Sequence, residues 1–281
     1  MNLRMNVILL PLLLTLLITP SAGHADDYAD VSLGQEERQH KALRLNAAVA
    51  SGILVWGTAN WDYFNSRPTA QSEGWFEHNS KEGGADKLGH VYITHLTSRA
   101  FRKIYLDWGY SEQEAGRLGI WSSLGMMTLM EVGDSFSSEY GFSYEDMLMN
   151  LAGAGFSYLL ELHPALDRKL DMRVEYSPEF GSDYQFDAFT DYQHLKYLLA
   201  LKAEGFESIH NPWLQALELH LGYYARKYAS YGIGEPDLRK RTLYVGLGVN
   251  ISYLLKNWIE TSIFDYLQLP YTYLPLEHKF D

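Results

Sequence analysis

Apolar segments bounded by helix start and stop signals follow one another through the first half of the chain. They predict four helices, over residues 41–61, 87–107, 112–132 and 144–162. Asp86 and Ser111 stand where the second and third helices begin, and Ser143, with Asp146 three residues on, begins the fourth. Because the connections between these helices are short, we expect them to pack as a bundle.

The pattern changes after Tyr176, where tyrosine becomes frequent. Residues 214–228 and 241–251 alternate apolar and polar positions with a period of two, which is typical of β-strands, and the glycine-rich segment between them suits a hairpin loop. A further helix is predicted over residues 192–203. The expected fold class is α+β: mainly a helical bundle of about four helices, followed by a tyrosine-rich region with a β-hairpin or small antiparallel sheet.

Each predicted strand has one apolar face that needs cover. These faces carry Leu217, Leu219, Leu221 and Tyr223 on the first strand, opposite Glu218, His220 and Gly222, and Leu243, Val245, Leu247, Val249 and Ile251 on the second. Two strands do not bury such faces alone. We expect them to pack on the helices, to join more strands from after Tyr176 or from residues 259–274, or to meet a partner.

Residues 1–25 have the pattern of a secretory signal peptide. Arg4 precedes an apolar run, and Gly23 and Ala25 place small residues at positions −3 and −1 of a cleavage site after Ala25. The run is about 13 residues, shorter than the roughly 20 that a spanning helix needs, and an uncleaved anchor is the alternative. We therefore expect an exported protein of the periplasm, free or peripheral to the inner or outer membrane.

The expected organisation of the whole chain follows from these elements. It comprises a signal peptide (1–25), a polar leader (26–40), a helical bundle domain with the polar motifs (41–172) and a C-terminal aromatic-rich α/β region (173–281). The stretch from Leu45 to Trp61 carries no charge, which favours a buried or membrane-surface helix over a spanning one. We expect the seven tryptophans to serve mainly in core packing, with a membrane-interface belt as the alternative.

Composition removes several classes of function. The chain of 281 residues has 35 acidic against 23 basic side chains, a formal charge of −12, which argues against a nucleic-acid partner. It contains no cysteine, which excludes disulfides, thiolate metal sites, a cysteine nucleophile and a lipid-modified cysteine. It also lacks the glycine-rich, HExxH and GxSxG motifs of nucleotide-binding proteins, zinc proteases and common serine hydrolases.

Three of the predicted helices carry polar residues at helical spacing. These residues are Asp86, Lys87 and His90 on the second helix, Glu131 and Asp134 on the third, and Asp146 and Asn150 on the fourth. Asp86 and Asp146 suit helix N-termini, whereas Glu131 and Asp134 end a helix, where the dipole disfavours negative charge. If the three faces converge, carboxylates outnumber cations in one shielded site.

Three uses of such a site remain open. The residues form a structural network of hydrogen bonds and ion pairs, or His90, Glu131 and Asp134 perform acid–base chemistry, or the surplus carboxylates bind a cation. No cofactor is expected outright; oxygen ligands with a single histidine would suit Mg²⁺, Ca²⁺ or Mn²⁺ if one is present.

The same residues carry a resemblance to a known family. The segments Gly83–His90, Glu131–Asp146 and Asn150–Ala154 resemble an uncharacterised bacterial family of predicted periplasmic lipoproteins, and more distantly the VanZ-like membrane proteins of teicoplanin resistance. The resemblance implies an envelope protein in which the seven polar residues above, with Gly89, Gly141 and Gly153, are the shared positions. It implies no reaction, and the missing cysteine removes the lipid anchor.

Taken together, the sequence predicts a secreted cell-envelope protein that binds an envelope lipid, glycan or protein partner through a helical bundle with a buried polar cluster. The alternative is an envelope hydrolase or transferase that uses Glu131, Asp134 and His90 for acid–base or metal-assisted chemistry. Neither nucleic acid nor nucleotide is an expected partner.

Overall fold

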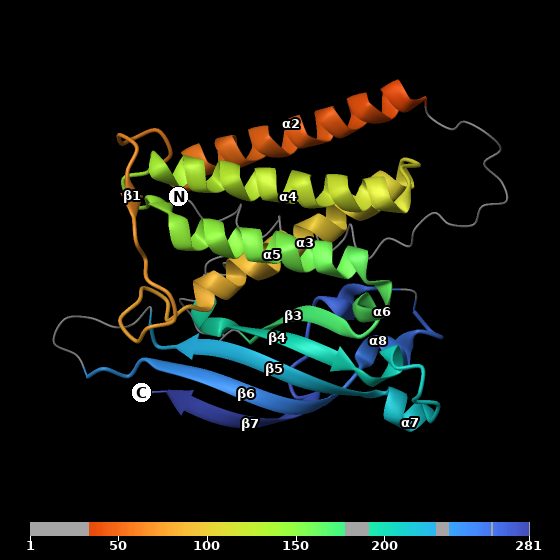
Figure 1. The fold of residues 1–281 in the computed structure, drawn as a ribbon. Coiled ribbons are helices and arrows are strands. Elements are labelled where there is room, and N and C mark those ends of the chain that lie inside the picture. The colour runs from red at the N-terminus through yellow and green to blue at the C-terminus, as the bar shows by residue number, and fades with distance from the viewer. Residues whose placement is uncertain (1–33, 178–190, 229–235, 260, 281) are drawn as a thin grey trace. The chain divides into compact units, whose positions relative to one another are not determined.

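The computed structural model describes residues 34–177, 191–228, 236–259 and 261–280 (Figure 1). The expected signal peptide and most of the expected hairpin loop lie outside these residues. The chain forms two compact units that do not follow its order. The helical unit comprises the described residues of Ser21–Glu73 and Ile93–Glu161, and the sheet unit comprises Gly74–Tyr92 and the described residues of Leu162–Asp281.

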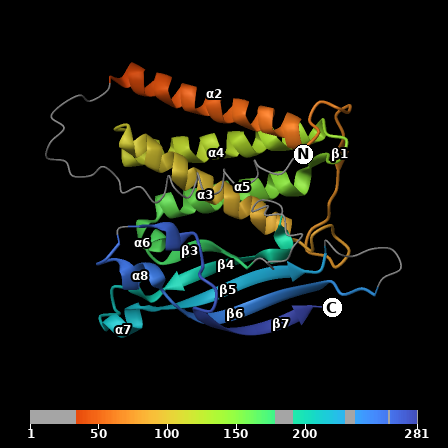
Figure 2. The same ribbon diagram turned by 180° about the vertical axis from the view of Figure 1, so that it is seen from behind.

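The described residues contain four long helices, as predicted. They are α2 (Gln35–Asn60), α3 (Ala85–Asp107), α4 (Glu112–Ser135) and α5 (Tyr144–Leu162). In the helical unit α4 packs on α2 and also contacts α5, where the Thr128 hydroxyl lies 3.7 Å from the sulfur of Met147 (Figures 1 and 2). Helix α2 begins at Gln35, so the last residues of the expected leader are helical.

The N-termini of α4 and α5 follow the local sequence signals, whereas Asp86, expected to precede the second helix, is the second residue of α3. At α4 the Ser111 hydroxyl accepts a hydrogen bond from the Glu114 amide, and the Glu114 carboxylate accepts one from the Ser111 amide, a reciprocal capping box. At α5 the Ser143 hydroxyl accepts from the Asp146 amide at 3.2 Å. Ser143 ends the short strand β2 (Phe142–Ser143), which pairs in parallel with β1 (Ala70–Gln71).

The sheet unit is built on one antiparallel sheet of five strands in chain order. They are β3 (Leu170–Tyr176), β4 (Leu195–Lys202), β5 (Leu217–Arg226), β6 (Lys240–Val249) and β7 (Tyr273–Phe280). Three short helices stand in the connections of the sheet (Figure 1). Helix α6 (Pro164–Asp167) precedes β3, α7 (Pro212–Gln215) precedes β5, and α8 (Ile251–Leu255) follows β6. The two predicted strands are β5 and β6, and the fold class α+β is confirmed.

The predicted helix over residues 192–203 is wrong. Tyr192–His194 forms a short 3-10 turn, residues 195–202 are strand β4, hydrogen-bonded to β3 on one side and β5 on the other, and Ala203 begins a second 3-10 turn. Leucine, lysine and alanine favour helices, but pairing on both edges of the strand outweighs that preference.

The sheet buries its polar face and exposes its apolar face, which is the reverse of what the hydrophobic effect favours. On β5 the side chains of Glu218 and His220 are buried, while Leu219 and Leu221 are about half exposed. On β6 Val245 is likewise 51% exposed. The alternation was predicted correctly, yet the apolar faces of β5 and β6 remain largely uncovered.

Candidate functional site

Polar side chains join the helices inside the helical unit. Thr94 of α3 donates to the Asn150 carbonyl oxygen of α5 at 3.1 Å, and the His95 ring lies 2.8 Å from the Ser157 hydroxyl. Ser123 of α4 donates to the Thr94 carbonyl at 2.8 Å. All of these side chains are buried. Burial and the nearby Arg99 charge lower the pKa of His95 to about 3, so this histidine is neutral.

Three of the predicted site residues come together at one end of this interior. Glu131 is 2% exposed, and its carboxylate accepts a hydrogen bond from the Ser143 amide at 3.4 Å. Burial, and after it the charges of Asp146 and Asp134, raise the pKa of Glu131 to about 9. Glu73 adds a smaller contribution of the same sign. Glu131 therefore carries a proton at neutral pH.

Serine side chains and a tyrosine surround these carboxylates. Glu145, which is fully buried, accepts hydrogen bonds from the hydroxyls of Ser72 and Ser143. The Tyr63 hydroxyl donates to the Met130 carbonyl at 3.1 Å, and burial, together with Asp134, raises the pKa of Tyr63 far above its usual value. This part of the unit thus combines carboxylates with neutral hydrogen-bonding groups, a set of oxygen donors that a divalent cation accepts.

Glycines let Tyr63 enter this site. A Cβ atom built on Gly57 of α2 or on Gly133 of α4 would lie about 2 Å from the Tyr63 ring. The ring therefore occupies the space that side chains would fill at both positions. Gly133 is two residues from Glu131, so the close approach also fixes the tyrosine beside the carboxylates.

The predicted residues at the start of α3 belong to the sheet unit. Asp86 and Lys87 are buried and form an ion pair of 2.8 Å between Oδ2 and Nζ. The Asp86 charge contributes to the raised pKa values of Tyr197 and Tyr223, after burial as the main cause. His90 is half-buried in the next turn. That Asp86, Lys87 and His90 share one site with Glu131, Asp134, Asp146 and Asn150 stays a prediction.

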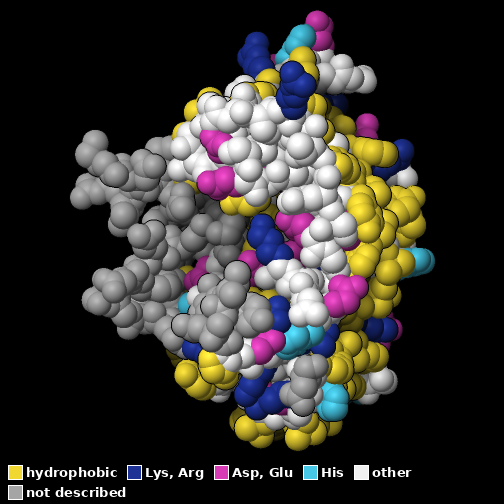
Figure 3. Space-filling model, turned by 90° about the vertical axis from the view of Figure 1, so that its left-hand side faces the viewer, with side chains coloured by type: hydrophobic (Ala, Val, Ile, Leu, Met, Phe, Trp, Pro, Cys, Tyr) yellow, Lys and Arg dark blue, Asp and Glu magenta, His cyan; other side chains and the backbone are white. Residues whose placement is uncertain are grey.

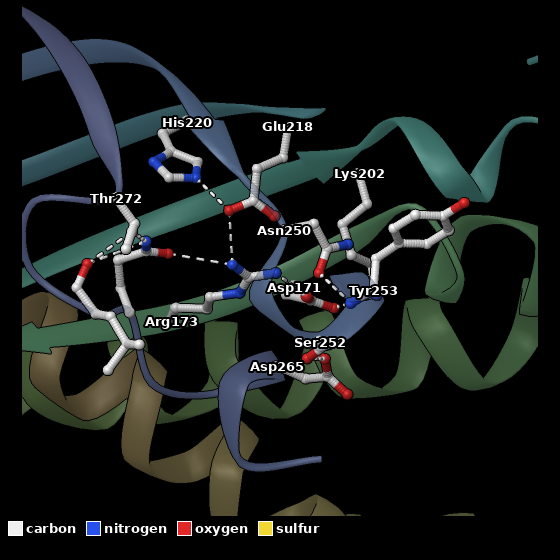
Figure 4. Close-up of polar contacts among 12 residues, drawn as sticks. Asp171, Arg173, Lys202, Glu218, His220, Asn250, Ser252, Tyr253, Asp265 and Thr272 are labelled. Carbon is white, nitrogen blue, oxygen red and sulfur yellow. Dashed lines mark hydrogen bonds and ion pairs between the residues drawn. The ribbon is translucent and has the colours of Figure 1, made fainter. Parts of the chain in front are cut away.

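A second polar network, in the sheet unit, was missed from the sequence. Figure 4 shows the Arg173 guanidinium between Glu218 and Asp171, at 2.8 and 2.6 Å. Lys202 pairs with Asp171 at 2.7 Å, and the His220 ring lies 2.7 Å from Glu218. The Glu218 pKa is lowered because hydrogen bonds from His220 and the Arg173 charge outweigh its burial.

A signal for this network is present in the sequence. Asp171, Arg173 and Glu175 alternate along β3, and Glu218 and His220 alternate along β5. Charged residues two apart lie on one face of a strand, so opposite charges on β3 and β5 can meet on one face of the sheet, across strand β4 that lies between them. His220 is buried, and its Nδ1 has no hydrogen-bond partner among the described residues.

The exterior of the helical unit is unusually apolar. Among the described residues, α2 is the one helix whose length and composition would allow it to cross a membrane, and 6% of its most apolar window is buried.

The expectation that the tryptophans serve mainly in core packing is wrong for three of them, since Trp121, Trp213 and Trp258 are 70, 83 and 86% exposed.

These features define an α+β protein with a polar helical interior. Residues 72–162 match the model of a family described as a predicted periplasmic lipoprotein (DUF2279), a description that includes no activity. The match contains all seven predicted polar residues and agrees with export to the periplasm. No curated protein and no solved structure matches the chain. The distant similarity to VanZ-like proteins stays a prediction.

Proposed function

We propose that this periplasmic protein binds the lipid of an envelope membrane through its helical unit. The exposed, uncharged helix faces contact the acyl region at the membrane surface, and the polar interior holds the helices together. The exterior of the unit is the observation that carries the proposal.

The exposed faces of the helices are rich in large apolar side chains. They include Leu43 and Val55 on α2, Trp121 and Val132 on α4, and Tyr144, Leu148, Leu151, Tyr158 and Leu159 on α5. On α5 Tyr144, Leu148, Leu151 and Tyr158 are spaced by four, three and seven positions, which places them along one side of the helix. Exposed apolar surface of this extent is typical of a membrane or protein contact.

The interior of the unit supports the same proposal. Where lipid surrounds helices, apolar side chains gain nothing by facing each other, and association depends on small residues and interhelical hydrogen bonds. The contacts of Thr94, His95 and Ser123 are of this kind. Gly119 of α4 also lets the α3 backbone approach, since a Cβ there would lie 2.6 Å from the Ser98 carbonyl oxygen.

Charges placed on the exterior test lipid binding. The variants Val55→Glu and Trp121→Glu change side chains that are 68 and 70% exposed, so folding should persist. The wild-type protein should sediment with membranes through a salt wash, and both variants should move to the soluble fraction in unchanged total amount. Gln113→Glu, an exposed change at the start of α4, is the matched control. A wholly soluble wild-type protein would refute the proposal.

An acid–base enzyme acting on envelope lipid or cell-wall material is the second candidate. Its support is the raised pKa of Glu131, which burial and the charges of Asp146 and Asp134 cause, because a buried carboxyl group that keeps its proton at neutral pH can serve as a general acid. His90 would be a further proton carrier, as the sequence predicts. In a variant of this proposal a divalent cation binds the site. Glu131 would then lose its proton and bind the cation as a carboxylate.

The variant Glu131→Gln separates catalysis from a structural role. If Glu131 is a catalytic acid, the variant is exported in normal amount but fails to complement a deletion strain. If its role is structural, complementation follows protein abundance. Addition of MgCl₂ or CaCl₂ against EDTA tests the cation: a bound ion raises the unfolding temperature of the wild-type protein, and Glu131→Gln reduces that rise.

A further inference from the structure

The loop that follows α2 holds one buried side chain beside an exposed one. Tyr63 stands in the loop of residues 61–66, directly after α2. Tyr63 is 2% exposed, whereas Phe64 is 59% exposed. The Tyr63 hydroxyl donates to the Met130 carbonyl at 3.1 Å and is also within hydrogen-bond reach of the Asp134 carboxylate. The tyrosine side chain therefore fills the space between this loop and the carboxylates.

The backbone on both sides of Tyr63 is strained. Asp62 has a φ of 56° and Phe64 a φ of 69°, in the left-handed region that non-glycine residues rarely adopt. Among the described residues of the helical unit, these are the two non-glycine residues with a positive φ. Residues persist in this region where the surrounding structure imposes it. Contacts of the loop therefore hold it in a conformation that its own backbone disfavours.

Hydrogen bonds near the surface fasten the loop to the connection after α4. The Asp62 carboxylate accepts from the Ser138 hydroxyl and from the Asn65 amide. The Ser66 amide donates to the Phe136 carbonyl at 3.1 Å. Figure 3 faces the end of α2 at which the loop lies, and its upper part is mostly backbone and uncharged polar atoms, drawn white. Water can replace these few hydrogen bonds when the loop moves outward.

The chain gives up stability at four positions to place this tyrosine. Glycine would fit the φ values of Asp62 and Phe64 without strain, as it does at Gly109 of the same unit, where φ is 82°. Conversely, the glycines at Gly57 and Gly133 weaken the helices that contain them. A tyrosine that served core packing alone would require no strained backbone beside it, and such strain is typical of functional and moving segments.

We propose that the loop of residues 61–66 is a strained lid whose Tyr63 side chain closes the carboxylate site and withdraws to admit a ligand to Glu131 and Asp134. The inference rests on the second function proposed above, in which these carboxyl groups act on a ligand or bind a cation. Withdrawal releases the strain of the backbone on either side of the tyrosine, which offsets part of the loss of its buried contacts. A ligand that takes the place of the tyrosine supplies the hydrogen bond that Asp134 loses, as a hydroxyl group does.

Carbodiimide labelling of the purified protein measures how often the lid is open. A water-soluble carbodiimide with an added amine modifies the carboxyl groups that it can reach, and peptide mass spectrometry reports each of them. Glu131 is buried, and Glu139, in the connection after α4, is exposed and serves as the reference in the same molecule. We expect slow labelling of Glu131 in the wild-type protein, limited by local opening, and fast labelling of Glu139.

The variant Gly57→Ala should hold the lid open. A Cβ at this position would lie 2.1 Å from the Tyr63 ring, so the ring cannot dock. The Glu131 rate should rise about tenfold or more, and the Glu139 rate should not change. Gly52→Ala, on the same helix with nothing within 4 Å of the new Cβ, is the matched control and should alter neither rate.

Phe64→Gly and Phe64→Ala separate backbone strain from packing. Both variants lose the same exposed ring, but only glycine relieves the left-handed backbone. We expect Glu131 to be labelled about fivefold or more slowly in Phe64→Gly than in Phe64→Ala, because the closed lid is then less strained. Equal rates would overturn the proposal.

Ser138→Ala tests the hydrogen bonds that fasten the lid. Ser138 is exposed, so folding should persist, and the variant removes one donor from the Asp62 carboxylate. Glu131 should be labelled about twofold or more faster than in the wild type. Ser51→Ala is the control, since Ser51 is also exposed and its hydroxyl donates to the Ala47 carbonyl of its own helix.

Two further results would overturn the proposal. One is equally fast labelling of Glu131 and Glu139 in the wild-type protein, since the site would then be open already. The other is wild-type labelling of Glu131 in Gly57→Ala that retains its circular dichroism spectrum or, if that variant does not fold, in Ser138→Ala.

Glu131→Gln distinguishes the inference from the function on which it rests. If the lid variants change the labelling rate and Glu131→Gln complements the deletion strain, the lid is supported and the acid–base candidate alone fails. If Glu131→Gln does not complement at normal abundance and the lid variants are labelled like the wild type, the lid alone fails.

Discussion

Replacement of Glu131 by glutamine should stabilise the protein near neutral pH. The pKa of Glu131 rises from 4.5 to about 9 in the folded protein, so the folded state holds a proton that the unfolded chain releases. A raised carboxyl pKa gives stability that is complete below the unfolded value of 4.5 and is lost as the pH rises from 4.5 towards 9. Glutamine is neutral in both states and escapes this loss.

The magnitude follows from the distance between the pH and the unfolded pKa. Near pH 7 the unfolded carboxyl is about 2.5 units above its pKa, and at 1.36 kcal/mol per unit the folded state loses about 3 kcal/mol relative to a neutral side chain. Near pH 5 the loss is below about 1 kcal/mol. The glutamine carbonyl can still accept the hydrogen bond from the Ser143 amide, and its NH₂ group would face the carboxylates of Asp146 and Asp134.

Urea unfolding near pH 5 and near pH 7 measures this difference, with hydrogen exchange of the α4 amides to report the helical unit by itself. We expect the advantage of Glu131→Gln over the wild type to grow with pH. Glu139→Gln, an exposed change in the same unit, is the control and should show no such growth. An advantage that is equal at both pH values, or a variant less stable than the wild type at both, would refute the reasoning.

Three further changes test the packing of the two units. Gly119→Ala brings a Cβ to 2.6 Å from the Ser98 carbonyl oxygen and should cost roughly 1–3 kcal/mol, whereas Gly125→Ala, with nothing within 4 Å, should be neutral or slightly stabilising; thermal unfolding compares them. Arg173→Met removes the guanidinium from buried Glu218 and leaves Asp171 with Lys202 alone, and should cost about 3–5 kcal/mol in urea unfolding, so an unchanged midpoint would contradict the ion network. Burial and the charge of Asp171 raise the pKa of Asp265 from 3.8 to about 6. The stability that this raised pKa provides is complete below pH 3.8 and is lost as the pH rises towards 6. Asp265→Asn should remove that part of the pH dependence of the unfolding temperature.

Local signals account for what the sequence predicts well. The Ser111 capping box and the Ser143 N-cap act within four residues, so their helices begin where the sequence indicates. The period of two along β5 and β6 likewise survives in the structure, since alternation of side chains is a property of any strand. Strand β4 was missed because its residues favour a helix and only its two neighbouring strands make it extended.

The candidate site was predicted in part for a related reason. Glu131 and Asp134 end an apolar helix against the helix dipole, which marked them as needing special surroundings, and Glu131 proves to be buried among carboxylates. Tyr63 and Glu145 were not predicted, because a tyrosine in a loop and a glutamate in a first helical turn carry no unusual pattern. The place of Tyr63 depends on Gly133, and the hydrogen bond of Glu145 on Ser72, and both of these partners are about 70 residues away in sequence.

The sequence by itself determined the helices, their caps and the existence of two faces on each strand, because these depend on neighbours within a few residues. Only the tertiary structure decided which face turns inward. A strand with leucines on one side and Glu218 and His220 on the other is compatible with either orientation, and the ion pairs of Arg173 with partners on β3 and β5 make burial of the charged face possible. Such pairing between distant segments is absent from any single stretch of sequence, and it leaves the apolar faces of β5 and β6 largely exposed.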